Sequence, residues 1–204
     1  MFVIGLTGGV ATGKSTVAAY LRTDHEVAVI DADQVARDVV RPGSPCLQAL
    51  VQALGEDILL PDGALNRALL RQRISDDASV RSIVEGITHP AIRASIATQL
   101  QGLFEQEHAA AVVEAALLVE TGSHKLYDAL IVVSCDGDLQ LQRLCERDQQ
   151  TPAQAQALIA AQMPLAEKEK AATIVIRNDG TLELLREATA QAWTSLIEAL
   201  AHPN

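Results

Sequence analysis

The sequence predicts an α/β fold in which helices flank a five-stranded parallel sheet. Three observations support this prediction. Short apolar runs alternate with stretches of helical periodicity, aromatic residues make up only 2% of the chain, and a glycine-rich loop joins the first apolar run to a helix. Strands separated by helices pair in parallel and are covered on both faces, which suits a chain of 204 residues with a sizeable core.

The predicted strands occupy residues 2–6, 27–31, part of 110–119, 129–134 and 173–177. A helix over 15–22 follows the first strand, and a turn at 178–180 leads into an amphipathic helix over 182–200. Parallel sheets bind ligands at the carboxyl ends of their strands. The glycine-rich loop, the acidic stretch at 31–33 and the region after Val119 should therefore lie at one edge of the sheet.

The glycine-rich segment GLTGGVATGKST, at residues 5–16, has the spacing of a phosphate-binding loop. In such a loop, backbone amides and the dipole of the following helix face phosphate oxygens, a lysine adds positive charge, and a serine ligates Mg²⁺. The residues expected to bind a nucleotide are Gly8, Gly9, Val10, Ala11, Thr12, Gly13, Lys14, Ser15 and Thr16, with Ser15 as the magnesium ligand. Ala11 stands where related loops often carry glycine, and we expect its φ to be negative.

Two segments are too long to be single connections between strands. The stretch 34–104 is mainly helical and contains the breaks RPGSP and PDG, and the stretch 137–172 is helical and rich in Arg, Gln and Lys. Helical inserts beside a nucleotide site commonly act as substrate cap and lid. We therefore predict a nucleotide-binding core made of 1–33, 105–136 and 173–204, an acceptor-binding insert over 34–104, and a lid over 137–172.

Asp31 and Asp33 follow the second predicted strand in the segment VIDADQVAR. In extended backbone, residues two apart face the same side, so both carboxylates could face the nucleotide. One of them could accept the proton of an attacking hydroxyl or hold magnesium through water. The alternative is that Asp33 caps a helix over 35–40, and both roles can coexist.

Arg143 and Arg147 are four residues apart on a predicted helix and therefore share a face. Two guanidinium groups over a phosphate-binding loop could neutralise charge on a transferring phosphoryl group, together with Lys14. The alternative is a solvated helix face on which the two arginines pair with Glu146 and Asp148.

The formal net charge of −10 argues against nucleic acid as a partner, because binding a polyanion requires Lys and Arg. A small phosphorylated ligand needs only a local cluster of cations. Arg37, Arg67 and Arg71 lie in the first insert, where a phosphate-bearing acceptor would need positive groups.

His89 and Pro90 lie inside a helical run over 79–103. Because proline removes an amide donor, we expect this helix to end or kink near His89, which then either caps it or contacts the acceptor. Glu120 follows LLV at the expected end of the third strand. There it could meet magnesium or an acceptor hydroxyl through water, and the alternative is a surface charge.

Cysteine usage and hydropathy lead us to expect a soluble cytoplasmic protein. Cys46, Cys135 and Cys145 show no paired spacing, as is typical of thiols in a reducing compartment. The amino-terminal segment lacks the pattern of a signal peptide, and no apolar run is long enough to span a bilayer. We expect no membrane partner and favour a monomer.

Seven motifs of the chain, taken in order, resemble those of the dephospho-coenzyme A kinase family, a family of P-loop small-molecule kinases. They are GLTGGVATGKST, VIDADQVAR, LGEDILLPDGALNRALLRQRI, ITHPAI, LLVE, QLQRLCERD and IVIRNDG. The resemblance covers nearly the whole chain, and the order and spacing of the motifs carry it. The chain departs from the family pattern at Ala11, at Ala116, where the family usually has proline, and at Thr173, where it usually has aspartate.

The resemblance implies a reaction, its substrates and several residue roles. The family transfers the γ-phosphate of ATP, with Mg²⁺, to the ribose 3′-hydroxyl of dephospho-coenzyme A, the final step of coenzyme A biosynthesis. By resemblance, Asp33 is the general base and Lys14 holds ATP with the loop. The first insert would bind the acceptor, and the arginine-bearing insert would close over the nucleotide.

Three other interpretations remain at this point. A related P-loop nucleoside or nucleotide kinase would share the fold but carry its own acceptor-reading patterns after strands two and three, and we find none. A guanine-specific switch would need Asn-Lys-x-Asp, which the sequence lacks. A catalytically inactive binding protein is disfavoured, because Lys14, Ser15, Asp33 and both lid arginines are present.

Overall fold

The computed structural model describes residues 1–202, which belong to two compact units. One unit consists of Met1–Ile30 and the chain from Leu103 onward, and the other unit is Asp31–Gly102. The division falls close to the ends of the predicted insert at 34 and 104, whereas the segment 137–172 is part of the first unit. The roles of insert and lid stay predictions.

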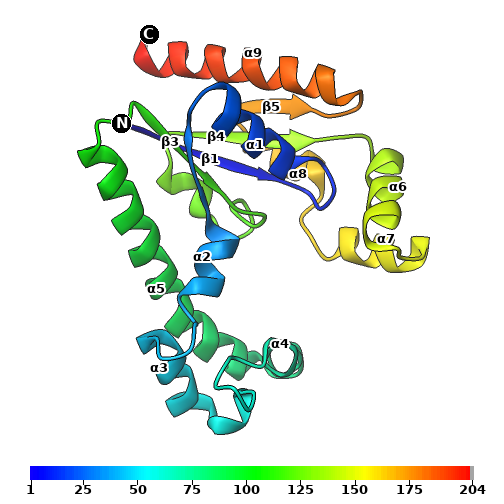
Figure 1. Cartoon of the computed structure of the whole chain (residues 1–204). Helices are drawn as coiled ribbons and strands as arrows, with labels where there is room; N and C mark the ends of the chain where they lie inside the picture. Colours follow the sequence, from blue (N-terminus) through cyan, green and yellow to red (C-terminus); the bar gives the residue numbers. More distant parts are fainter. Residues whose placement is uncertain (203–204) are drawn as a thin grey trace. The chain divides into compact units, whose positions relative to one another are not determined.

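The first unit is built on a five-stranded sheet with the order β2-β3-β1-β4-β5 (Figure 1). Its strands are β1 (Phe2–Gly8), β2 (Ala28–Asp31), β3 (Ala110–Glu114), β4 (Ala129–Ser134) and β5 (Ile174–Arg177). β1 pairs in parallel with β3 and with β4, and β4 pairs in parallel with β5. The predicted α/β fold with five parallel strands is confirmed.

Both faces of this sheet are covered, as the side chains of β4 show. Ile131 and Val133 join a core cluster with residues of α1 (Lys14–Asp24) and α9 (Leu182–Ala201), whereas Leu130 and Val132 pack with Leu118 on the other face. In Figure 1, α9 runs alongside β5. Because neighbouring side chains point to opposite faces and both faces are buried, the strand is an unbroken apolar run in the sequence.

The segment after β4 forms three helices, α6 (Gly137–Asp148), α7 (Pro152–Ala160) and α8 (Leu165–Lys170). α7 begins at Pro152 because Thr151 and Gln154 form a capping box, in which each side chain binds the other residue's backbone amide. A short 3₁₀ helix, η2 (Ser123–Leu126), precedes β4. α8 leads directly into β5, so this segment starts and ends at the sheet.

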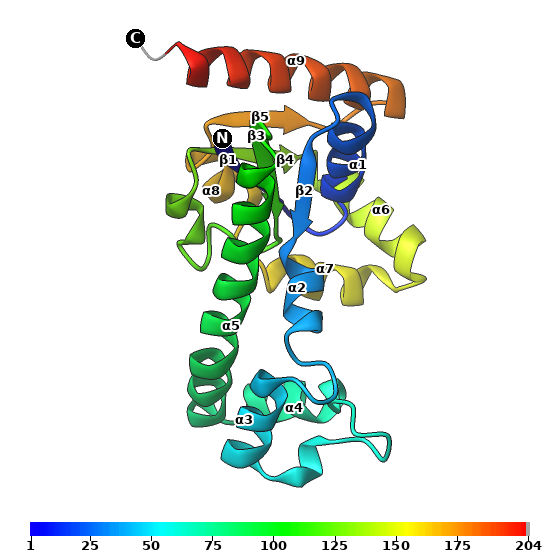
Figure 2. The same cartoon turned by 60° about the vertical axis from the view of Figure 1, so that its left-hand side comes forward.

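The second unit is helical and has a hydrophobic core of its own. Its elements are α2 (Ala32–Asp38), α3 (Pro45–Leu54), η1 (Glu56–Ile58), α4 (Arg67–Asp76) and most of α5 (Ala78–Glu105) (Figure 2). Leu50 from α3, Ile58 from η1, Leu70 from α4 and Val84 from α5 belong to one buried cluster. This cluster holds the four elements together without any strand of the sheet.

Pro90 does not end its helix, so of the two predicted outcomes near His89, an end or a kink, the end is wrong. α5 runs without interruption over 28 residues with Pro90 inside it. A proline removes one backbone donor and clashes locally. The helix continues because residues on both sides of Pro90, including Val84, Ile87 and Ala91, pack against the core of the second unit.

The cysteines and the hydropathy of the helices do not indicate a functional site. Cys46, Cys135 and Cys145 are free, and burial raises the pKa of the Cys46 and Cys135 thiols, which keeps them protonated. Within residues 1–202, no helix is both long enough and apolar enough to cross a membrane.

Candidate nucleotide-binding site

A cavity of about 490 Å³ opens beside the loop that joins β1 to α1. Loop residues between Gly9 and Thr16 form one part of its wall, and the rest is formed by Ala116, Arg143, Arg147 and Gln162. The first turn of α1 borders the cavity with its partial positive charge, an arrangement that favours an anionic ligand. Volume and lining suit a phosphorylated small molecule.

Gly13, the residue before α1, can only be glycine. Its φ is +97°, in the region that side chains rarely adopt, and a Cβ there would lie 2.3 Å from Nδ2 of Asn178. That same Nδ2 donates a hydrogen bond of 2.8 Å to the carbonyl oxygen of Thr12. Asn178, which follows β5, therefore fixes the loop at the point where the helix begins.

Ala11 adopts a φ of +58°, so the prediction of a negative φ is wrong. The residue is third in a four-residue turn that the Thr12 amide closes by donating to the Gly9 carbonyl, with an N···O distance of 3.4 Å. The third position of such turns frequently requires a positive φ, and glycine adopts it without strain. The turn imposes its geometry on Ala11 despite the steric cost of a Cβ.

A buried carboxylate that the sequence analysis missed pairs with the lysine of the loop. Glu114, whose side chain is 5% exposed, accepts hydrogen bonds through Oε1 from Lys14 Nζ at 2.6 Å and from Ser15 Oγ at 3.2 Å. Arg22 approaches its other oxygen at 3.8 Å. An acidic residue at the carboxyl end of an apolar strand, as in VVE, was the available signal.

The third strand ends at Glu114, and the expectation that Glu120 ends it is wrong. Oxygen atoms of Glu114 and Ser15 are the kind of ligand that Mg²⁺ prefers. Within residues 1–202, no three His, Cys, Asp or Glu side chains gather in a way that could hold a metal ion. A magnesium ion here would thus take most of its ligands from water and from the nucleotide's phosphates.

Both arginines of α6 line the cavity, and each has a partner within the protein. Arg143 donates to the carbonyl oxygen of Asn178 at 2.8 Å. Arg147 pairs with Asp148 at 2.7 Å, and this contact raises the pKa of Arg147 and lowers that of Asp148. Arg147 therefore makes one of the ion pairs expected if this helix face were merely solvated, and it also lines the cavity.

Asp31, and not Asp33, caps the helix that follows β2. Its Oδ1 accepts a hydrogen bond of 2.9 Å from the Gln34 amide, whereas Asp33 is exposed in the first turn of α2. The premise that both aspartates lie in extended backbone is wrong, because the helix starts at Ala32 directly after the strand. Asp33 belongs to the second unit, so its meeting with the nucleotide stays a prediction.

The predicted acceptor contacts other than Glu120 also lie in the second unit. Arg67 donates to the carbonyl oxygen of Arg37 at 3.3 Å, so these two residues are neighbours, and both side chains are exposed. Arg71 and His89 are exposed on α4 and α5. Exposed guanidinium groups of this kind are available to a phosphorylated acceptor.

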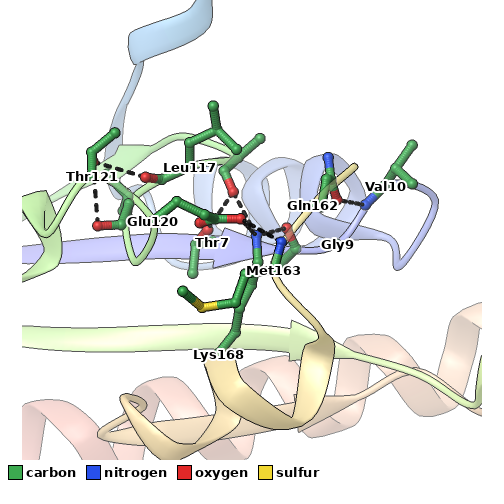
Figure 3. A network of polar contacts seen from close by, with 12 residues as sticks. Thr7, Gly9, Val10, Leu117, Glu120, Thr121, Gln162, Met163 and Lys168 are labelled. Carbon is green, nitrogen blue, oxygen red and sulfur yellow. Dashed lines mark hydrogen bonds and ion pairs between the residues drawn. The ribbon is translucent and has the colours of Figure 1, made fainter. Parts of the chain in front are cut away.

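Glu120 is held by a buried lysine rather than exposed as a surface charge. Its Oε1 lies 2.8 Å from Nζ of Lys168, and its side chain is 20% exposed (Figure 3). Its Oε2 is buried without a hydrogen-bond partner among the described residues. The surface-charge alternative is therefore wrong, and a contact with the acceptor stays a prediction.

Two glutamines hold the peptide groups of Val10 in the loop. Gln162 accepts from the Val10 amide at 2.8 Å, and Gln140 donates to the Val10 carbonyl at 2.8 Å. Figure 3 shows the first of these contacts. No sequence pattern marks either glutamine, since the contacts join residues more than a hundred positions apart in the chain.

The other two departures from the family pattern have local structural explanations. The carbonyl oxygen of Ala116 accepts hydrogen bonds from Thr7 Oγ1 at 3.1 Å and from Lys168 Nζ at 2.8 Å, which hold the strand end without a proline. Thr173 accepts a hydrogen bond from the Leu130 amide at 3.0 Å. This contact lies at the amino-terminal ends of β4 and β5, opposite the edge that carries the loop.

Comparison with known proteins gives a consistent result. A family profile described as dephospho-CoA kinase matches residues 2–183. The dephospho-CoA kinase of Anaeromyxobacter dehalogenans is 44% identical over 185 residues, which cover 91% of this chain and 87% of that protein. The dephospho-CoA kinase of Geobacter sulfurreducens is 44% identical over 193 residues, which cover 95% of this chain and 98% of that protein.

Solved structures show the same fold. Dephospho-CoA kinase from Campylobacter jejuni superposes with a TM-score of 0.72 at 25% identity and covers 97% of this chain and 98% of its own. Shikimate kinase from Bacteroides thetaiotaomicron superposes with a TM-score of 0.51 at 16% identity, covering 97% of this chain and 98% of its own, and this likeness concerns the fold alone.

Ala11→Gly should stabilise the protein by about 1 kcal/mol, because glycine adopts a positive φ without the steric cost of a Cβ. Urea unfolding measures the change. Ala19→Gly is the matched control, since Ala19 is exposed inside α1, where glycine should cost roughly 1 kcal/mol. Equal destabilisation by both changes would contradict the positive φ at Ala11.

Proposed function

Because the chain belongs to the dephospho-CoA kinase family, we propose that it phosphorylates the ribose 3′-hydroxyl of dephospho-coenzyme A with ATP to give coenzyme A. The observation that carries this proposal is the convergence of Lys14 and Ser15 on buried Glu114, at a cavity that two arginines also line. That arrangement supplies the groups that phosphoryl transfer uses. The −10 charge supports small-molecule substrates without nucleic acid, and we favour a cytoplasmic monomer.

Catalysis in this site rests on positioning and charge neutralisation. The transition state of phosphoryl transfer is loose, with negative charge spread over the equatorial oxygens, so fixed cations lower its energy more than covalent chemistry would. Lys14 and the amino-terminal turn of α1 would bind the phosphates of ATP, and Arg143 and Arg147 would face them from α6. The loop is fixed at both ends, by Gln140 and Gln162 at Val10 and by Asn178 at Thr12.

Magnesium would be held beside the β- and γ-phosphates by Ser15, with Glu114 acting through water, and would offset negative charge there. The residues present fit this role, because a buried carboxylate oxygen and a hydroxyl already share a hydrogen bond. With a nucleotide bound, the Lys14 ammonium would exchange part of its contact with Glu114 for phosphate oxygens, and Glu114 would keep Lys14 oriented.

Asp33 is the proposed general base. It is exposed in the first turn of α2. A charged carboxylate can accept the proton of the 3′-hydroxyl as the bond to phosphorus forms. Arg37, Arg67, His89 and Glu120 are proposed contacts of the acceptor.

The decisive experiment measures ADP release from MgATP with dephospho-coenzyme A, adenosine, AMP and a nucleoside panel as separate acceptors. Strong stimulation by dephospho-coenzyme A alone, with a product one phosphate heavier by mass spectrometry, is expected. Stimulation by another acceptor would move the function to a related kinase. Tight ATP binding with slow, acceptor-independent hydrolysis would instead indicate a switch or an inactive binder.

Asp33→Asn should lower kcat by roughly 10²–10⁴-fold and leave the affinity for ATP nearly unchanged, because asparagine keeps the shape but cannot accept the proton. Steady-state kinetics and calorimetric ATP binding measure the two quantities. Asp62→Asn, at an exposed turn of the same unit, is the control and should leave both unchanged. A near-normal kcat for Asp33→Asn would remove this residue from the base role.

Glu114→Gln should raise the Mg²⁺ concentration needed for half-maximal activity by roughly 10–100-fold, the usual effect of losing a group that orients a metal or its ligands. Glutamine keeps an acceptor for Lys14 and Ser15 but loses the charge. Affinity for metal-free ATP, measured with chelator present, should not fall, because a negative charge has been removed. A parallel loss of metal-free ATP affinity would show that Glu114 instead shapes the loop.

A further inference from the structure

Lys168 is a fully buried cation that the proposed mechanism does not use. It belongs to α8, its side chain is 0% exposed, and its ammonium reaches three acceptors (Figure 3). These are Glu120 Oε1 at 2.8 Å, the Ala116 carbonyl at 2.8 Å and the Gly8 carbonyl at 3.3 Å. An ammonium group has three N–H donors, so its hydrogen-bonding capacity is used completely.

Burial of this charge is a poor way to gain stability. Removing an ammonium and a carboxylate from water is costly, and well-packed apolar side chains of similar volume often serve a fold equally well. A methionine would fill the space of Lys168 without any desolvation cost. Stability alone therefore does not explain the lysine, and we look for the explanation in the positions that its three hydrogen bonds fix.

Each of the three acceptors belongs to a segment that carries part of the nucleotide site. Gly8 ends β1 and is the first residue of the phosphate-binding loop. Ala116 lines the cavity two residues after Glu114. Figure 3 shows Lys168 extending from α8 to the place where these segments meet.

Glu120 connects Lys168 to the segment that precedes α8. The oxygen that pairs with Lys168 also accepts a hydrogen bond of 3.3 Å from the amide of Met163. The preceding residue, Gln162, lines the cavity and holds the Val10 amide of the loop. Lys168 thus connects, directly or through Glu120, the loop, the segment after β3 and the segment before α8.

We propose that Lys168 and Glu120 form a positioning pair for phosphoryl transfer. The pair fixes the Gly8 carbonyl, the Ala116 carbonyl and the Met163 amide relative to one another, and with them Glu114 and Gln162. A positional error of about 1 Å among groups that bind a reacting phosphate costs far more rate than affinity. The proposal goes beyond the kinase activity proposed above and rests on it.

The test removes both charges at once. Lys168→Met alone leaves Glu120 without its cation and is expected to be unstable. The double variant Lys168→Met/Glu120→Gln leaves no unpaired charge, fills the space of the lysine, and keeps an acceptor for the Met163 amide. Its kcat should fall roughly 10–100-fold, while its melting temperature stays within a few degrees of the wild type and KM for ATP changes less than kcat.

Lys170→Met is the matched control. Lys170 lies on the same helix and pairs with Glu167 at 2.7 Å, but its side chain is 70% exposed. Its loss should leave kcat, KM and melting temperature unchanged, because exposed ion pairs contribute little. Glu120→Gln alone keeps an acceptor oxygen for both hydrogen bonds but leaves the buried Lys168 ammonium without its counter-charge, so it is expected to be unstable like Lys168→Met.

A double variant with wild-type kcat would overturn the positioning role, and so would one that fails to fold, since the pair would then serve stability. A loss of activity that follows KM for ATP instead of kcat would also overturn it. Wild-type protein assayed in parallel separates these results from the proposed function: an inactive wild type refutes the kinase activity itself, whereas an active wild type isolates the effect of the pair.

Discussion

The parallel pairing of β1 with β3 is the constraint on which the nucleotide site depends. Its register places Leu6 opposite Glu114, so β3 ends in a carboxylate where β1 runs on toward the loop. Parallel neighbours direct their carboxyl ends to the same edge of a sheet. Lys14 and Glu114, a hundred positions apart in the chain, therefore lie 2.6 Å from each other, and the sheet itself fixes where charge of each sign is located.

The three cations of the cavity have partners inside the protein: Lys14 binds Glu114, Arg143 binds the Asn178 carbonyl and Arg147 binds Asp148. In a chain with a net charge of −10, such partners hold the three cations in fixed positions at the cavity. In the proposed function, a bound phosphate group would replace these contacts. The cations are held in place before the nucleotide arrives, and fixed geometry is what lowers the barrier of phosphoryl transfer.

Local sequence patterns predicted the helices and strands well. They did not predict the backbone geometry of residues whose surroundings in the fold impose another conformation. The strand at 129–134 and the helix after Thr181 follow from apolar periodicity and a side-chain cap. Ala11 was expected at negative φ, but the turn closed between Gly9 and Thr12 requires a positive one. Pro90 does not end its helix, because residues on both sides of it pack against the surrounding core.

The sequence by itself determined the alternation of strands and helices, the phosphate-binding loop and the family, because each rests on residues close together in the chain. Tertiary structure alone decided which side chains complete the site. β3 ends at Glu114 and not at Glu120, because strand length and register set its last residue. Asn178, Gln162 and Lys168 act through contacts that span more than a hundred residues. Spacing along the chain carries no information about such contacts, since packing of the sheet and its helices creates them.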